Sequence, residues 1–150
     1  MSAAVDEAML LDKQLCFLVY RLHRGITDQY RPVLHELGLT YPQYLVMLVL
    51  WESEPMTVGQ IGSRLHLNTG TLSPLLKRLQ SAGLIERNRS PEDERSVLIE
   101  LTAHGRDMRV QARQATAGKD ECLTESAHDA RELHSLLSAL VARVDNANKP

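Results

Sequence analysis

The sequence predicts a mainly helical fold that carries one small β-hairpin. Apolar residues recur at helical spacing through most of the chain, leucine is abundant, and aromatic residues make up only 4% of the sequence. Two short helical patterns joined by a tight turn lie within residues 57–81, and a polar, basic hairpin pattern follows at 84–101. This order predicts a winged helix-turn-helix, although any small pair of helices followed by any hairpin gives a similar pattern.

The first expected helix spans residues 6–36. Its start lies at either Asp6 or Asp12, because aspartate is a favoured N-cap residue. A start at Asp12 puts Cys16 in the first turns, near the positive end of the helix dipole. Gly38 ends the element. The apolar side of this helix consists of Leu11, Leu15, Leu18, Val19 and Leu22.

A second helix is expected to open at Thr40. Thr40 and Gln43 have the spacing of a capping box, and Pro42 occupies the first turn. Residues 44–51 are apolar nearly all round, which is typical of a helix at the centre of a core. Pro55 stops this helix before the next segment begins.

The next segment forms the predicted helix-turn-helix. Its first helix opens at Thr57, with Gln60 at capping-box spacing. Its second helix carries an apolar stripe of Leu72, Leu75, Leu76 and Leu79. The other side of that helix holds groups that can reach base edges and phosphates. The predicted DNA-binding residues here are Thr69, Gly70, Thr71, Ser73, Pro74, Lys77 and Arg78.

The hairpin is the predicted wing, with short strands at 84–87 and 97–101 and the basic residue Arg89 between them. Arg95, at the tip, is placed to enter the minor groove, where A·T-rich steps concentrate negative potential. Asp93 is spaced to hold that guanidinium through paired hydrogen bonds. A weak surface ion pair is the commoner meaning of such a spacing.

The distribution of charge favours a local nucleic-acid surface. The whole chain has a net charge of −2, which argues against a protein that is basic all over. Residues 56–90 instead hold five basic residues against one acidic residue, a net charge of +4. Binding to DNA therefore has to come from this segment.

Two further helices are expected, at residues 102–125 and 126–145. The last helix carries a stripe that resembles a coiled-coil seam, formed by Leu133, Leu136, Leu137, Leu140, Val141 and Val144. Such a stripe either forms a homodimer interface or packs back on the chain's own first helix. Dimerisation also suits a helix-turn-helix, because two copies double the contacts with DNA.

One domain spanning residues 1–150 is expected, with a DNA-binding unit at about 56–101 and dimerisation helices at about 6–36 and 102–145. The longest apolar run, at 45–51, is far too short to span a bilayer, and the N-terminus has no signal-peptide pattern. We therefore expect a cytoplasmic protein with reduced cysteines and no membrane partner. The His, Cys and acidic residues have no convincing metal-ligand spacing, so neither a metal nor another cofactor is predicted.

Cys16 is the candidate for chemistry. A cysteine on an apolar helix face is usually a small buried hydrophobe, whereas a reactive one needs thiolate character. Tyr30 lies 14 residues further on, about 21 Å along a continuous helix, so it cannot touch Cys16 within one chain. If Tyr30 or Tyr41 does reach Cys16, it comes from a second subunit, unless the helix breaks sharply at Gly25.

Three segments carry a resemblance to a known family. They are the Leu-Cys-Phe run at 15–17, the segment 37–52 with its Tyr-Pro-Gln-Tyr run, and the segment 70–79. Together they resemble the organic hydroperoxide resistance regulators (OhrR), a branch of the MarR family. The Pro-Glu-Asp-Glu-Arg run at 91–95 is similar to the wing of the MarR family as a whole. The resemblance covers roughly residues 10–110.

The resemblance implies a homodimeric repressor that binds a palindromic operator when reduced and responds to organic hydroperoxides. It makes Cys16 the peroxide-sensing thiol, with Tyr30 and Tyr41 of the other subunit as its hydrogen-bond donors. The first oxidation product, sulfenic acid, is reversible. Two-cysteine members then form a disulfide between subunits, whereas one-cysteine members pair with a small thiol. Cys122 is either the resolving cysteine of this disulfide or a bystander.

Two other classes of function are kept open beside this one. A cysteine peroxidase would turn over many times with a thiol reductant, but no Cys-x-x-Cys motif supports it, so we do not predict an enzyme. A MarR-type repressor could instead be released by a small aromatic ligand. The tyrosines would then line a pocket, and a Cys16→Ser variant would respond normally.

Overall fold

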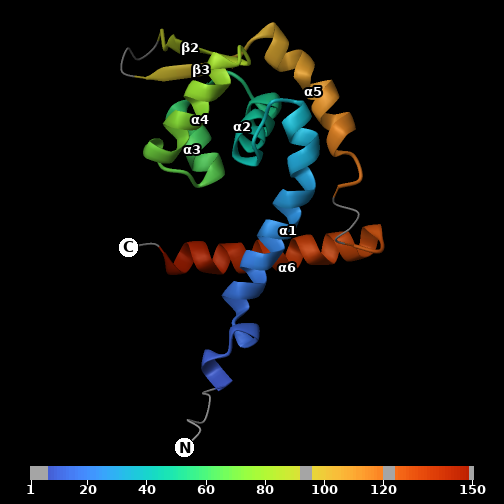
Figure 1. Cartoon of the computed structure of the whole chain (residues 1–150). Coiled ribbons are helices and arrows are strands. Elements are labelled where there is room, and N and C mark those ends of the chain that lie inside the picture. Colours follow the sequence, from blue (N-terminus) through green and yellow to red (C-terminus); the bar gives the residue numbers. More distant parts are fainter. Residues whose placement is uncertain (1–6, 92–95, 120–123, 149–150) are drawn as a thin grey trace, which may run out of the picture. The chain divides into compact units, whose positions relative to one another are not determined.

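The computed structural model describes residues 7–91, 96–119 and 124–148 (Figure 1). Helices dominate it, and three short strands form one antiparallel sheet. This architecture confirms the predicted mainly α fold with a hairpin wing. In chain order the elements are η1 (Glu7–Met9), η2 (Leu11–Lys13), α1 (Leu15–Glu36), α2 (Tyr41–Glu52), β1 (Met56–Thr57), α3 (Val58–Leu65), α4 (Thr69–Ser81), β2 (Ile85–Arg89), β3 (Val97–Leu101), α5 (Ala103–Thr116) and α6 (Ala127–Ala147).

The chain divides into two compact units, one ending at Thr116 and the other beginning at Ala117. The first unit contains α1 to α5 and the sheet, and the second contains α6. Within the described residues no single helix is long and apolar enough to cross a membrane, although α1 and α2, bent by 75°, pass that test of length and composition as a pair. The division into one DNA-binding unit and two sets of dimerisation helices stays a prediction.

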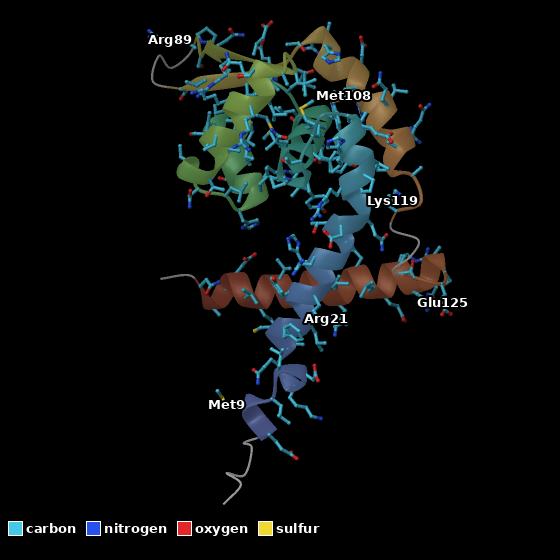
Figure 2. The ribbon with its side chains drawn as sticks, in the orientation of Figure 1. Met9, Arg21, Arg89, Met108, Lys119 and Glu125 are labelled. Atoms are coloured by element: carbon cyan, nitrogen blue, oxygen red, sulfur yellow. The ribbon has the colours of Figure 1, made fainter. Side chains whose placement is uncertain are left out.

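Helix α2 lies at the centre of the first unit, as predicted. It contacts α1, α3, α4 and α5, and Figure 1 shows it between α1 and the α3–α4 pair. Val46, Met47 and Leu50 of α2 are fully buried. Both predicted capping boxes are present, with Thr40 and Gln43 at the start of α2 and Thr57 and Gln60 at the start of α3. Met108 of α5 also points into this core (Figure 2).

The predicted start of the first helix is wrong. Two short 3₁₀ turns replace the first residues of the expected 6–36 helix, and α1 begins only at Leu15. The reason lies in the backbone, because Leu10 and Gln14 adopt extended conformations that interrupt helical hydrogen bonding. From Leu15 onward the helix runs without a break through Gly25.

The sheet has the strand order β1-β3-β2, with β3 in the middle. The predicted hairpin is present as β2 and β3, and Ile85 pairs with Leu101 at its base. Strand β1 was not predicted, and its Met56 pairs with Ile99 of β3. The extra strand therefore connects the start of the helix-turn-helix to the wing.

The two last helices differ in how well the sequence predicted them. The expected 102–125 helix ends at Thr116, because Gly118 adopts a left-handed conformation (φ +76°) that terminates it. In the second unit, α6 matches the expected 126–145 helix closely, and Ser126 caps it by accepting a hydrogen bond from the backbone N–H of Asp129. The apolar stripe of α6 is largely exposed, and Leu136 is 60% accessible.

Candidate DNA-binding surface and sensing cysteine

The turn between α3 and α4 is tight and has a clear physical basis. His66 adopts a left-handed conformation (φ 53°) at the end of α3, and the Leu67 N–H donates to the Gly62 carbonyl. A Cβ atom at Gly62 would lie 2.7 Å from the Leu67 carbonyl oxygen, so only glycine fits there. Asn68 then caps α4 by accepting from the Thr71 N–H at 2.9 Å. These contacts fix the angle between the two helices.

Helix α4 has the two-sided character expected of a DNA-reading helix. Its Leu72, Leu76 and Leu79 are buried in the core of the first unit. Ser73 is partly buried, and the other residues predicted for DNA binding on α4 are exposed, namely Thr69, Gly70, Thr71, Pro74, Lys77 and Arg78. The buried stripe fixes the helix to the core and leaves the polar side open to a ligand.

The wing presents exposed basic side chains on β2. Arg87 and Arg89 alternate along the strand, and Figure 2 shows Arg89 at the outer end of the hairpin. The Ser90 N–H donates to the Ser96 carbonyl oxygen at 2.9 Å, which holds the two arms together beyond the strands. The predicted tip residues Asp93 and Arg95 lie outside the described residues.

One of the basic residues behind the +4 charge is neutralised locally. Arg64 forms an ion pair with Glu52, which lies at the end of α2. Over the described part of the chain, Lys77, Arg78, Arg87 and Arg89 have no ion-pair partner. Positive charge is therefore concentrated on α4 and on the wing.

Cys16 is exposed and is the second residue of α1. Cys16 therefore lies in the first turn of α1, although this helix starts at neither of the two expected positions, Asp6 and Asp12. Apolar side chains close to it in the sequence are also exposed, with Leu15 66% and Leu18 51% accessible. Nearby, the guanidinium of Arg21 lies over the ring of Phe17, 5.8 Å from its centroid, so this basic side chain packs along its own helix.

Tyr30 and Tyr41 lie close together at the other end of α1. Their ring centroids are 5.4 Å apart in an edge-to-face arrangement, and Tyr44 packs against both. Tyr30 is buried and Tyr41 is half-buried. Because α1 is continuous, about 21 Å of helix separates this tyrosine cluster from Cys16 of the same chain. The structure brings the two tyrosines together but does not bring them to Cys16 within one subunit.

A groove of about 460 Å³ lies beside this cluster. Its wall combines apolar side chains with basic ones, and Arg31 on that wall forms an ion pair with Asp28 at 2.5 Å. The lining residues are His23, Thr27, Arg31, Leu34, His35, Leu39, Thr40, Tyr41 and Pro42. A concavity of this size is large enough for a small organic molecule.

The second predicted redox residue, Cys122, lies outside the described residues. No group of three or more His, Cys, Asp or Glu side chains that could hold a metal occurs in residues 7–91, 96–119 and 124–148. A cluster that sequence reasoning missed lies at the start of α5, where Trp51, Glu54 and Arg106 meet. Trp51 bonds to Gly105, 54 residues away, and Glu54 bonds to Arg106, 52 residues away, so these residues form no motif.

Comparisons with known proteins identify the family. The family model for the transcriptional regulators SarA/Rot matches residues 28–110. The chain is 45% identical over 140 residues to the organic hydroperoxide resistance transcriptional regulator of Bacillus subtilis, covering 93% of this chain and 95% of that protein. Such identity over nearly the whole of both chains indicates common ancestry rather than a shared fold alone.

Solved structures agree with this relationship. Reduced AbfR bound to DNA, a protein known from Staphylococcus epidermidis, superposes with a TM-score of 0.83 at 34% identity, covering 96% of this chain and 99% of that one. The disulfide form of AbfR superposes with a TM-score of 0.65 at 37% identity, covering 90% and 95% of the two chains. The chain thus belongs to the MarR family of winged helix-turn-helix, DNA-binding transcriptional regulators, within the branch of the organic hydroperoxide resistance regulators.

Proposed function

We propose that this chain is a redox-sensing repressor whose reduced homodimer binds operator DNA and is released when an organic hydroperoxide oxidises Cys16. The observation that carries the proposal is the position of Cys16 on α1. The thiol is exposed among apolar side chains that are themselves exposed, and the predicted tyrosine partners lie at the far end of the same helix. A second copy of the chain would bury this exposed apolar surface of α1 in a dimer interface.

A two-fold dimer would bring these separated groups together. In a symmetric interface the same surface of each subunit contacts its counterpart, so antiparallel α1 helices would place the Cys16 end of one copy beside the tyrosine end of the other. The exposed apolar stripe of α6 offers further area for such a contact. Each dimer would then hold two equivalent sensing sites.

The chemistry at such a site balances as a two-electron oxidation. The Cys16 thiolate attacks the terminal peroxide oxygen, the O–O bond breaks, and the alkoxide leaves and takes up a proton to become an alcohol. The hydroxyl stays on sulfur as sulfenic acid. Tyr30 and Tyr41 of the other subunit would donate their O–H groups to the thiolate and hold it in place. Cys122 of the partner subunit would then attack the oxidised sulfur, form a disulfide and release water.

In the reduced state, each α4 would lie in the major groove of one half-site of the operator. Lys77 and Arg78 suit phosphate oxygens, Thr71 and Ser73 suit base edges, and the wing would follow the backbone toward the minor groove. Half-sites about 34–36 Å apart match one turn of DNA. Because bacterial operators lie in the cytoplasm, the proposal also locates the protein there.

Disulfide formation would release DNA through geometry. The Cα atoms of a disulfide lie within about 7 Å of each other, so joining two more distant cysteines has to displace their helices. Since both reading helices belong to one dimer, their separation would change and the two half-sites could no longer be read together. The structures of AbfR in reduced DNA-bound and disulfide forms support a switch of this kind.

The test compares the wild type with Cys16→Ser on an operator duplex selected from random DNA. One equivalent of cumene hydroperoxide should release the wild type and produce a covalent dimer on a non-reducing gel. The Cys16→Ser variant should bind the same duplex and ignore the peroxide. Release of Cys16→Ser by cumene hydroperoxide would overturn the proposal.

The groove beside Tyr41 supports a second candidate trigger, a small aromatic ligand bound without covalent change. Its apolar wall and its basic residues fit an aromatic ring that carries an acidic group. Under this alternative, Cys16→Ser would respond normally to such a ligand, and dialysis without any reductant would restore DNA binding.

A further inference from the structure

The start of α5 is tied to the end of α2 by two side chains. The indole N–H of Trp51 donates to the Gly105 carbonyl oxygen at 2.8 Å. The carboxylate of Glu54 accepts from Arg106 Nε at 2.7 Å and from Arg106 Nη2 at 3.0 Å. It also accepts from the backbone N–H of Leu101 at 2.7 Å, so one carboxylate joins the last residue of β3 to the first turn of α5.

The same turn of α5 is fixed on its other side to the end of α4. The Thr102 hydroxyl donates to the Gly83 carbonyl oxygen at 2.6 Å and accepts from the Gly105 N–H at 3.0 Å. The Thr102 N–H donates to the Leu84 carbonyl oxygen at 3.0 Å. A Cβ atom at Gly105 would lie only 2.0 Å from that oxygen, so the two backbones are in direct contact. We call the contacts of Trp51, Glu54, Thr102, Gly105 and Arg106 the α5 clamp.

The Glu54–Arg106 pair differs from a single-contact surface ion pair because two hydrogen bonds form it, although the Arg106 side chain is 54% exposed. Two nitrogen atoms of one guanidinium face both oxygens of one carboxylate, which fixes direction as well as distance. The Glu54 side chain is only 23% exposed. The pKa of Arg106 is raised above its usual value, first of all by the hydrogen bond to Glu54. The pair therefore holds a defined geometry.

The α5 clamp has a mechanical consequence. Helix α5 is the segment through which the chain leaves the winged helix toward the second unit. With its first turn bonded to the ends of α2, α4 and β3, α5 cannot swing about Thr102 without breaking several hydrogen bonds. A rotation of α5 is therefore passed to α4 and the wing rather than absorbed at the joint.

We propose that Glu54, together with Trp51, is a positioning residue that couples α5 to the winged helix-turn-helix through β3 and the end of α2. This inference rests on the proposed function, because it identifies the joint through which oxidation of Cys16 reaches α4. Without the contacts of Glu54 and Trp51, the first turn of α5 is held only by Thr102 and by the buried packing of Met108 and Ala112, so it can tilt. The protein is then oxidised normally but releases DNA incompletely. The reduced dimer also discriminates less between operators that differ in the spacing of their half-sites.

The experiment uses full-length Glu54→Gln, with Trp51→Phe as a second variant that keeps the aromatic ring. Operator Kd is measured before and after one equivalent of cumene hydroperoxide. A coupling between sites typically changes affinity by about 5–150-fold, and we expect the ratio of oxidised to reduced Kd to fall by at least about fivefold in both variants. Glu52→Gln is the matched control, because Glu52 lies two residues away and pairs with Arg64 inside the winged helix. The ratio of oxidised to reduced Kd for Glu52→Gln should stay within about twofold of the wild-type ratio.

A second arm needs no oxidation and separates this inference from the proposed function. Reduced proteins are tested on operators with one base pair inserted between the half-sites, which rotates one half-site by about a tenth of a turn. The insertion should raise the operator Kd of the wild type and of Glu52→Gln strongly. For Glu54→Gln, the factor by which Kd rises should be at least about threefold smaller. If Glu54→Gln loses affinity equally on all operators and keeps the wild-type ratio of Kd values, the clamp is merely structural and the inference is overturned. If the wild type itself ignores peroxide, the proposed function fails while the spacing arm still decides the role of Glu54.

Discussion

Cys16 and Tyr30 lie on the same unbroken helix, 14 residues and about 21 Å apart, so the thiol and the phenol of one chain cannot meet. Gly25, between them, continues the helix instead of breaking it. The structure therefore excludes the sharp bend at Gly25 that the sequence allowed as an alternative. Any contact between Cys16 and Tyr30 requires a second copy of the chain.

Tyr30→Phe and Tyr41→Phe should slow oxidation of Cys16 without unfolding the protein. Each phenylalanine keeps the ring packing of the tyrosine cluster but loses one O–H donor. A hydrogen bond to a charged group contributes ~1.5–3 kcal/mol, so the rate constant should fall by about tenfold or more. Trapping of the sulfenic acid by dimedone measures that rate. Tyr44→Phe is the control, because its hydroxyl contacts Thr116. Equal slowing in all three variants would contradict the assignment.

Lys77→Ala should reduce the salt dependence of operator binding. Each phosphate contact that is lost lowers the slope of log K against log salt concentration by about 0.9. The measurement is a titration of one operator duplex at several salt concentrations. Arg113→Ala, an exposed basic residue on α5, should leave the slope unchanged. An unchanged slope for Lys77→Ala would contradict the assignment of Lys77 on α4 to a phosphate contact.

Gly62→Ala should destabilise the turn of the helix-turn-helix. The added Cβ meets the Leu67 carbonyl oxygen at 2.7 Å, and overpacking of this kind costs about 1–3 kcal/mol of unfolding free energy. Urea denaturation at one fixed protein concentration measures this loss. Gly59→Ala is a matched control on the same helix, because the nearest atom to its Cβ lies at 3.9 Å. A Gly62→Ala variant as stable as Gly59→Ala would show that the turn is not tight.

Cys122→Ser should separate sensing from resolution. The variant should still consume one equivalent of peroxide at Cys16, because the first step needs only one thiol. It should form no covalent dimer on a non-reducing gel, and its sulfenic acid should persist until a small thiol is added. A covalent dimer that still forms in Cys122→Ser would assign the disulfide to other residues.

Local signals explain what the sequence predicted well. The pairs Thr40–Gln43 and Thr57–Gln60 satisfy helix ends within four residues, so their pattern was sufficient to place α2 and α3. The buried stripe and the exposed polar side of α4 likewise follow from helical periodicity alone.

What the sequence missed depends on distant partners or on the backbone. Strand β1 has two residues and exists only because β3 pairs with it. Glu54 bonds to Leu101 and Arg106, 47 and 52 residues away, and no local pattern marks such a contact. The late start of α1 comes from extended backbone at Leu10 and Gln14, although Asp12 nearby looked like a cap.

The central claim is that the Cys16 thiolate accepts hydrogen bonds from tyrosines of the other subunit. Mixed dimers test this claim most directly. One dimer combines a Cys16→Ser subunit with a Tyr30→Phe/Tyr41→Phe subunit, so its one remaining Cys16 thiol faces intact tyrosines only across the interface. The other dimer places all three substitutions on one subunit, so its one remaining Cys16 thiol keeps intact tyrosines only in its own chain. The account predicts rapid oxidation by cumene hydroperoxide in the first dimer and slow oxidation in the second. The reverse order, or equal rates in both, would contradict it.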